Sequence, residues 1–532
     1  MEREPLYLRP DVQVEPLVDH WYAWSHLIPP ATAARNLTER HLKIMDSYIQ
    51  APEIHAAAAK NPKFLGGPFI DYDGARVDEI VALRDQTKHA RAHLLELSAA
   101  LEALDHCLRM GARGFSLQSL YDRIPQPLRG YVELVYDLSN QPSFRIIEPL
   151  LYRSKYYDRS AQSLMFSVTK GDERPFVLST PRLSGDGLLH LPAAFGDSMA
   201  RSIYGLLRTP QPWEVIKRMF GHFVEPDDTL LRSILTPAIP RPYVGYNGAG
   251  ARWRYFGHAC ILVETPSSSF FFDPVISYTY DTTLPRYTYL DLPEHIDYAL
   301  ITHNHQDHVL FETLLQIRDR VGAIVVPRSG GGSLQDPSIK LVLQNCGFDN
   351  VVELGEFETI PTKSGSITGL PFLGEHADLD VRSKLAYLIR TRNRSMLFAA
   401  DSCNIEPELY KHVYEETGTI DAVFLGMECD GAPLTWLYGP LLTQPIERGM
   451  DESRRLAGSN FEQALDIITR FRCKEAYVYA MGQEPWLNHI MSIKYSSKSR
   501  PILESDRLVS WCAEHGIYAE RLFGEKELRF DC

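Results

Sequence analysis

The sequence of 532 residues has few of the features that mark secreted, membrane or nucleic-acid-binding proteins. Its eight cysteines are scattered without a Cys-x-x-Cys pair, which argues against a disulfide framework and against a thiolate metal site. No long uninterrupted apolar stretch is present, and the charged start, residues 1–5, lacks the apolar core of a signal peptide. We therefore expect a cytoplasmic protein that does not enter a membrane.

Two kinds of ligand are also unexpected. The formal net charge of −13 argues against nucleic acid, because binding to phosphates depends on clustered Lys and Arg. Residues 330–332 are three glycines, but they lack the further glycine and lysine spacing of a phosphate loop or a dinucleotide site. A redox enzyme of this composition would take its electrons from an external donor, since it shows no flavin or nicotinamide site of its own.

The length and the 44% hydrophobic content suit two domains. We place the boundary in the proline-rich stretch 239–243, which gives an N-terminal α+β domain of residues 1–243 and a second domain of residues 244–532. Hydrophobic spacing and turn residues predict four elements in the first domain: a long helix over 77–110, strands at 162–168 and 175–183 with a hairpin at 171–172, and a helix capped by Asp197 that runs to Leu207. No catalytic spacing occurs there. A role in dimerisation, or in docking of substrate or carrier, is expected.

The strongest chemical signal is a His-x-His-x-Asp-His motif formed by His303, His305, Asp307 and His308. It directly follows the apolar run 296–301, which reads as a buried strand, so the motif lies on the loop that leaves the strand. His303 and His305 can face one ion, while Asp307 and His308 reach a second. Imidazole and carboxylate ligands suit Zn, Fe or Mn better than Ca or Mg. The motif therefore predicts a dinuclear metal site.

The pattern resembles the metallo-β-lactamase superfamily. Residues 257–264 and 269–274 read as the strand pair that opens that fold, and the apolar strand 395–400 ends in Asp401. The resemblance implies an αβ/βα sandwich for the second domain, in which Asp401 bridges both metals. It also implies that His489, after the strand 476–480, is the last histidine ligand.

One position departs from the usual superfamily pattern, in which a histidine stands between the first motif and Asp401. Here the segment reads Gly374-Glu375-His376. Successive side chains of an extended backbone point to opposite sides, so only one of Glu375 and His376 is expected to be a ligand. A ligand at His376 would favour a zinc hydrolase. A ligand at Glu375 would add a third carboxylate, and anionic oxygen ligands favour iron in its higher oxidation state.

The whole chain resembles the diiron β-hydroxylases, metallo-β-lactamase-fold enzymes known from chloramphenicol biosynthesis. The similarity lies in Gly374-Glu375-His376, in the run 426–433, and in the long region before the metal fold. It implies a ligand at Glu375, two iron ions, dioxygen as oxidant, and an aromatic aminoacyl substrate, similar to p-aminophenylalanyl, carried as a thioester on a nonribosomal peptide synthetase. A dinuclear zinc hydrolase of an ester, lactone or thioester is the alternative interpretation, and a non-catalytic carrier-binding scaffold is a second.

Glu428 and Asp430 follow the apolar run 422–425, which should end near the metals. We expect them to act in catalysis by orienting ligand imidazoles or gating an open metal position, although Asp430-Gly431 could simply form a turn. The aromatic stretch 436–438 could line an aryl pocket or only pack.

Carrier domains are typically acidic, so a carrier needs a local basic patch on this acidic protein. The best candidate is the loop 494–500, with Lys494, Lys498 and Arg500, although an ordinary solvated loop would have the same composition.

Overall fold

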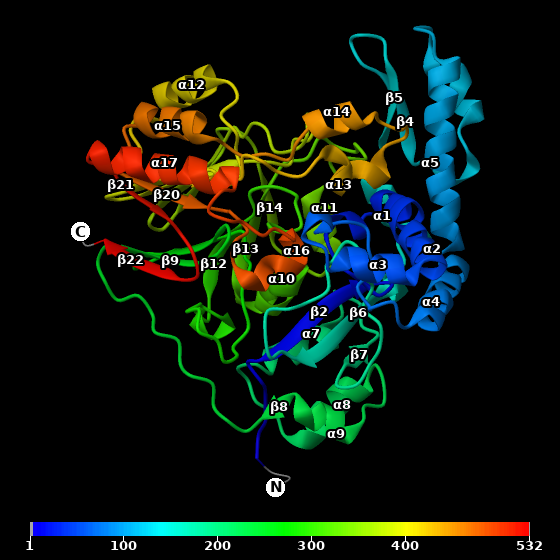
Figure 1. Ribbon diagram of the computed structural model, residues 1–532, viewed down its shortest axis with the longest axis horizontal. Helices are drawn as coiled ribbons and strands as arrows, with labels where there is room; N and C mark the ends of the chain where they lie inside the picture. Colours follow the sequence, from blue (N-terminus) through cyan, green and yellow to red (C-terminus); the bar gives the residue numbers. More distant parts are fainter. Residues whose placement is uncertain (1–3, 531–532) are drawn as a thin grey trace.

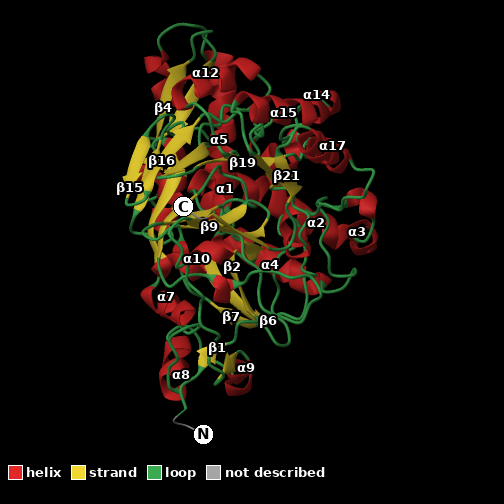
Figure 2. Cartoon of the chain, turned by 90° about the vertical axis from the view of Figure 1, so that its left-hand side faces the viewer, coloured by secondary structure: helices red, strands yellow, loops and turns green. Residues whose placement is uncertain are grey.

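The computed structural model of the protein describes residues 4–530, shown from two directions in Figures 1 and 2. Its larger part is built on two seven-stranded sheets. The first has the strand order β14 (Val351–Leu354), β13 (Val321–Pro327), β12 (Ile296–Leu300), β11 (Ser269–Phe272), β10 (Cys260–Glu264), β9 (Ala251–Gly257) and β22 (Lys526–Phe530). The second has the order β15 (Thr359–Thr362), β16 (Gly365–Leu370), β17 (Ala386–Thr391), β18 (Ser395–Phe398), β19 (Ala422–Gly426), β20 (Glu475–Tyr479) and β21 (Tyr518–Arg521).

An aromatic core fills the space between the sheets. Phe272 of the first sheet stacks on Phe398 of the second with ring centroids 3.7 Å apart, and Trp253 packs edge-on against Phe424. Helices cover the outer faces: α10 (Phe311–Ile317) and α11 (Ile339–Asn345) on the first sheet, and α12 (Pro407–Thr417), α15 (Phe461–Arg470) and α17 (Arg500–Glu514) on the second. This arrangement confirms the expected αβ/βα sandwich.

Strand direction decides where the polar loops meet. Strands β11 to β14 run parallel to one another, as do β18 to β21, so their carboxyl ends lie at one edge of each sheet. The strands predicted from apolar runs are confirmed as β12, β18, β19 and β20. The metal motif follows β12 and Asp401 follows β18, so the loop ends that carry them converge at the same edge of the sandwich.

The N-terminal region contains a four-stranded sheet in the order β3 (Trp21–Tyr22), β2 (Val12–Val18), β6 (Gln162–Val168) and β7 (Leu189–Leu191). A hairpin joins β4 (Val132–Tyr136) and β5 (Pro142–Ile146), and β1 (Tyr7–Leu8) pairs with β8 (Leu235–Thr236). The helices are α1 (Pro30–Asn36), α2 (Leu42–Gln50), α3 (Pro52–Ala59), α4 (Val77–Ala90), α5 (Ala92–Gly111), α6 (Glu148–Leu151), α7 (Ser198–Gly205), α8 (Trp213–Gly221) and α9 (Asp228–Ser233). Both views place α8 and α9 far from α12 and α15.

The predictions for this region were partly wrong. The strand 162–168 is confirmed as β6, and Asp197 caps α7 by accepting hydrogen bonds from two backbone amides of its first turn. The predicted helix 77–110 is two helices, because the chain breaks at Arg91, whose guanidinium binds Asp19 and Asp158. Residues 175–183 form no strand and 171–172 no hairpin; β6 pairs instead with β2 and β7.

The two regions of the chain share packed surface. Both of the clusters that contain N-terminal side chains also include residues of the first large sheet. The predicted boundary after Tyr243 falls in the coil between β8 and β9, and a division into two folding units remains a prediction. No helix within residues 4–530 is both long and apolar enough to cross a membrane.

A buried ion network also joins the regions. Arg174 donates to Glu15 on β2 at 2.6 Å and to Glu312 on α10 at 2.7 Å, and Arg182 binds Glu15 at 3.1 Å. Tyr22 adds a hydrogen bond of 2.5 Å to Glu312. Each carboxylate is only 2% exposed, so the guanidinium of Arg174 is needed to compensate two buried negative charges.

We expect Arg174→Met to lower the free energy of unfolding by about 3–5 kcal/mol, because it leaves the buried carboxylate of Glu312 without its cation, while Glu15 keeps Arg182. Chemical denaturation of the variant and the parent protein measures this difference. The control is Arg328→Met, which removes an exposed pair with Glu358 and should change stability little. Equal losses in the two variants would contradict the role assigned to the network.

Candidate metal centre

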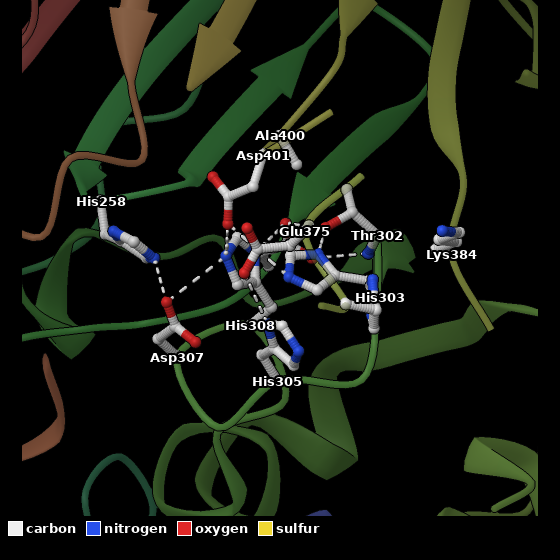
Figure 3. A network of polar contacts seen from close by, with 12 residues as sticks. His258, Thr302, His303, His305, Asp307, His308, Glu375, Lys384, Ala400 and Asp401 are labelled. Carbon is white, nitrogen blue, oxygen red and sulfur yellow. Dashed lines mark hydrogen bonds and ion pairs between the residues drawn. The ribbon is translucent and has the colours of Figure 1, made fainter. Parts of the chain in front are cut away.

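Histidines and carboxylates from four loops meet at the carboxyl edge of the sandwich (Figure 3). The loop after β12 supplies His303, His305, Asp307 and His308, and every one of these side chains is buried. Three overlapping groups have ligand atoms within 4.8 Å of one another: His303, His305 and Glu375; His303, His308 and Asp401; and His258, Asp307 and His308. The structure therefore brings together six of the seven metal ligands predicted from the sequence.

The first group is organised around His305. Its Nδ1 lies 2.9 Å from a carboxylate oxygen of Glu375, and its Nε2 lies 2.9 Å from the Tyr438 hydroxyl. His303 stands edge-on to His305, with ring centroids 4.7 Å apart. His303, His305 and Glu375 could thus hold one ion between them.

The other two groups share His308. The Nε2 of His308 lies 2.9 Å from Asp401 Oδ2 and 3.5 Å from Asp307 Oδ2. Asp401 also lies 3.6 Å from the Nε2 of His303, so its carboxylate stands between His303 and His308. The close approach requires Gly426, since a Cβ there would lie 2.6 Å from Asp401 Oδ1.

Asp273 and Thr302 orient the imidazoles. Asp273 accepts hydrogen bonds from the Thr302 amide at 2.7 Å, from the Thr302 hydroxyl at 2.6 Å and from His308 Nδ1 at 2.8 Å. The proton of His308 therefore sits on Nδ1 and leaves Nε2 free for an ion. His303 Nδ1 lies 3.1 Å from the Thr302 hydroxyl, which fixes its ring in the same way.

His258 is a member of this site that sequence reasoning left without a role. It sits in the turn between β9 and β10, where its φ of 51° is left-handed. Its Nδ1 accepts a hydrogen bond from the Gly482 amide at 3.2 Å, so its Nε2 carries the proton and donates to Asp307 at 3.0 Å. His258 therefore positions a ligand rather than acting as one. The feature of the sequence that could have indicated this role is a histidine in the short turn between two predicted strands.

The electrostatics of the group fit metal ions. Burial, with the neighbouring imidazoles, lowers the pKa of His303 well below its usual range, and burial lowers the pKa of His305 to about 4, so both rings are neutral and able to coordinate. Burial and the charges of Asp401 and Asp307 raise the pKa of Glu375 well above normal, because the nearby cations, His308 and Lys384, balance the three carboxylates only in part. His303 Nε2 and Asp401 Oδ1 are buried without hydrogen-bond partners. Two divalent ions would supply the missing positive charge and would also give these two buried atoms a partner.

The segment that carries Glu375 and His376 is not extended, although the sequence prediction assumed an extended backbone there. Glu375 has a φ of 66°, and Gly374, Ala377 and Asp378 are also left-handed. Such backbone is costly and persists where the surrounding structure enforces it. The Glu375 carboxylate lies 2.9 Å from His305 Nδ1, whereas His376 packs its ring against that of His305, 4.6 Å between centroids, and its Nδ1 lies 3.3 Å from Gly374 O. The geometry supports Glu375 as the ligand.

His489 does not join the cluster, so this sequence prediction was wrong. After β20 the chain turns sharply at Ala480 and Gly482, then forms a short 3₁₀ turn (Pro485–Leu487) and α16 (Asn488–Met491). This path carries His489 to Tyr22 in the N-terminal region, with ring centroids 5.9 Å apart. The order of His489 along the chain was not enough to predict its position in space. The histidine that lies beside Asp307 is His258.

A cavity of about 300 Å³ opens from the ligands towards the surface. Glu375, Asp401, Asp307 and His305 form its floor, and its apolar wall includes Leu437, Leu456 and Met491. Glu428 and Asp430 also line it, but within residues 4–530 neither hydrogen-bonds to a ligand imidazole. Asp273 and Thr302, and not Glu428 or Asp430, orient the ligand imidazoles His308 and His303, while gating of an open metal position stays a prediction. Burial, followed by the charges of Glu375 and Asp401, raises the pKa of Glu428 well above normal.

Comparisons with known proteins agree with this geometry. Residues 7–238 match the family described as a diiron non-heme β-hydroxylase N-terminal domain, and residues 269–438 match the β-lactamase superfamily domain. The 4-amino-L-phenylalanyl-[CmlP-peptidyl-carrier-protein] 3-hydroxylase of Streptomyces venezuelae is 41% identical over 98% of this chain and 99% of its own length. The crystal structure of CmlA, a diiron β-hydroxylase from the same organism, superposes with a TM-score of 0.93 at 39% identity, covering 99% of this chain and 100% of that one.

We expect Asp273→Asn to weaken binding of one ion of the pair by about 10–100-fold, since the amide no longer holds the proton of His308 on Nδ1. Metal titration of the ion-free protein measures this affinity. The matched control is Asp297→Asn: Asp297 accepts the same pair of bonds from the amide and hydroxyl of Ser269, but at the other end of β12. Unchanged affinity in the first variant, or an equal loss in both, would contradict the assignment.

The adjacent pair gives a second test. Glu375→Ala should lose one metal ion per chain or abolish turnover, whereas His376→Ala should retain nearly full occupancy, because only the Glu375 carboxylate faces His305. Elemental analysis after dialysis gives the occupancies. The reverse pattern would assign the ligand to His376.

Proposed function

We propose that this chain, which belongs to the family of diiron non-heme β-hydroxylases, hydroxylates the β-carbon of an aromatic aminoacyl group held as a thioester on a carrier domain of a nonribosomal peptide synthetase, in antibiotic biosynthesis. The observation that carries the proposal is the cavity that connects the metal ligands with the surface beside a basic loop. The relative from S. venezuelae is named for this reaction on 4-aminophenylalanyl. A ring of similar shape is the expected substrate.

The cavity has the chemistry that such a substrate needs. Leu437, Leu456 and Met491 offer an apolar wall for an aryl ring. The side chain of Glu428 makes no hydrogen bond within the described chain and lines the cavity, so its carboxylate can receive the substrate ammonium. Asp430 is exposed at the same surface and adds negative charge for the amine. We propose these roles in addition to the gating of an open metal position predicted from the sequence.

His303, His305 and Glu375 would hold one iron, and Asp307, His308 and Asp401 the other. When bound, the irons supply the activation of dioxygen that converts a C–H bond to an alcohol. The chain contributes by orienting the ligands through Asp273 and His258, by burying them from bulk water and by placing the β-carbon over the cavity floor. Inserting one oxygen atom from dioxygen and reducing the other to water requires two electrons and two protons. We assign the electrons to an external donor.

The carrier would dock at the cavity mouth. Met491, Ser492 and Ile493 line the cavity, and the chain continues directly into the exposed loop with Lys494, Lys498 and Arg500. This loop offers positive charge on a protein of net charge −13, which suits an acidic carrier. Phe64, 51% exposed, adds an apolar contact beside the cavity residue Leu65. The region 1–243 thereby takes part in docking; dimerisation is a further role proposed for it, and we place the enzyme in the cytoplasm.

A zinc hydrolase is less well supported. A third carboxylate ligand at Glu375 makes the site more anionic than a histidine-rich zinc site, and this favours iron.

The decisive experiment compares metals. Protein produced with ample iron should carry two Fe per chain, show ligand-to-metal absorption in the near ultraviolet and visible, and hydroxylate a carrier-bound amino acid in a single turnover after reduction. Zinc lacks such bands because its d shell is full. A colourless, zinc-loaded protein that is active without iron would overturn the proposal and favour hydrolysis.

Carrier dependence gives a second prediction. Free amino acid should react far more slowly than the same residue loaded on its carrier, because most of the binding energy comes from the carrier and its arm. Reversing the charges of Lys494, Lys498 and Arg500 should slow carrier association in a salt-dependent manner and leave the iron content unchanged. Reversal of Lys411, an exposed lysine on α12, is the control. Equal turnover of free and loaded substrate would remove the carrier from the mechanism.

A further inference from the structure

The short helix α13 (Leu434–Tyr438) forms part of the metal centre in two ways. Trp436 and Leu437 line the cavity, and the Tyr438 hydroxyl lies 2.9 Å from His305 Nε2. His305 presents its Nδ1 to Glu375. When Nδ1 coordinates an ion, Nε2 carries the proton and donates it to Tyr438. Tyr438 thereby selects the coordinating nitrogen of His305.

A five-residue helix cannot hold this position by its own hydrogen bonds, because isolated helices shorter than about 12 residues are marginal. Two arginines from the N-terminal region instead bind carbonyls of α13 and of the segment that directly follows it, residues 439–442. Arg40 Nη2 donates to Trp436 O at 2.7 Å and to Leu437 O at 3.1 Å. Arg35 donates from Nε to Pro440 O and from Nη2 to Leu442 O, both at 3.1 Å.

Both guanidinium groups are buried, with Arg35 1% and Arg40 9% exposed. Arg35 also binds Glu102 on α5 at 2.6 Å. Arg40 has no carboxylate partner within residues 4–530; it also contacts Asn36 Oδ1 at 3.4 Å and lies over the ring of Trp24, with Cζ 6.0 Å from the ring centroid. Burial lowers the pKa of Arg40 to about 10, so it stays charged at neutral pH. A buried cation without a counter-ion is expensive, and here the carbonyl end of α13 compensates it.

The local backbone places both arginines on one side. Residues 35 and 40 would lie about 140° apart around a regular α-helix, which turns through about 100° per residue. Between α1 and α2 the chain instead forms a π-helix, Leu37–His41, whose wider turn reduces this separation. Single π turns of this kind are frequent at functional sites. The distortion lets Arg35 and Arg40 both reach carbonyls of one segment, residues 436–442.

We propose that Arg35 and Arg40 are positioning residues of the metal centre: they clamp α13 so that Tyr438 holds His305 in its coordinating tautomer. The N-terminal region then contributes to catalysis through the geometry of one iron, besides docking the carrier. This inference rests on the proposed assignment of His305 as an iron ligand.

The test separates positioning from general stability. Arg40→Met and Tyr438→Phe should each alter the Mössbauer signal of one iron and leave the other unchanged, and Arg40→Met should add nothing further when Tyr438 is already Phe. The matched control is Arg91→Met, which removes another buried arginine of the N-terminal region, paired with Asp19 and Asp158 and not in contact with α13. Arg91→Met should destabilise the protein at least as much and leave both iron signals unchanged. Arg40→Lys should partly restore the parent spectrum.

Hydrogen exchange of the iron-free protein gives a reading that does not depend on the metal. Amides of residues 434–442 should exchange about tenfold faster in Arg40→Met than in the parent, as expected from loss of a hydrogen bond to a charged group, and should be unaffected in Arg91→Met. Three results would each contradict the proposal that Arg35 and Arg40 hold α13: unchanged exchange in Arg40→Met, an unchanged spectrum in Arg40→Met, or equal spectral changes in Arg40→Met and Arg91→Met. A parent protein that binds no iron pair would instead overturn the proposed function, while the exchange data would still test the hold on α13.

Discussion

The burial of several carboxylates in one small volume is the constraint on which the rest of the structure depends. Asp273, Asp307, Glu375 and Asp401 are all less than 9% exposed, and Glu428 faces the same cavity. Mutual repulsion and desolvation make such a cluster unfavourable unless cations balance it. The imidazoles of His303 and His305 are held neutral by burial, and His308, whose pKa the neighbouring carboxylates raise, supplies only one positive charge against them. The fold is therefore built around positions for two metal ions.

The surrounding elements serve this constraint. Parallel strands deliver their loops to one edge, and Gly426 permits the backbone of β19 to approach Asp401. Asp273 orients His308 and His258 orients Asp307. A backbone amide in turn holds each of these two side chains: that of Thr302 binds Asp273, and that of Gly482 binds His258. The N-terminal region is joined to the sandwich in two places. The Glu15–Arg174–Glu312 network contacts α10, and Arg35 and Arg40 bind the carbonyls of α13 and the segment after it. Catalytic geometry is in this way distributed over the whole chain.

Local patterns in the sequence predicted the parts of the site that local geometry controls. Apolar runs bounded by polar loops identified β12, β18 and β20, and the spacing of the motif identified four of the side chains that the structure brings together. The other features of the fold and of the site depend on contacts between residues that are distant in the sequence. Arg174 and Arg182 draw the segment between them into the ion network, so its apolar residues do not form a strand. The left-handed φ of Glu375 and the path that takes His489 to Tyr22 likewise have no signature in spacing. The strand pair around His258 was identified, but the role of that residue required the position of Gly482.

The central claim is that two cations compensate this buried negative charge. It is tested most directly by following the thermal unfolding midpoint of the metal-free protein during titration with ferrous iron under anaerobic conditions. The account predicts a rise in the midpoint that saturates at two ions per chain, because ligands that bind only the folded state stabilise it. A midpoint that is independent of iron, or that saturates at a single ion, would contradict it.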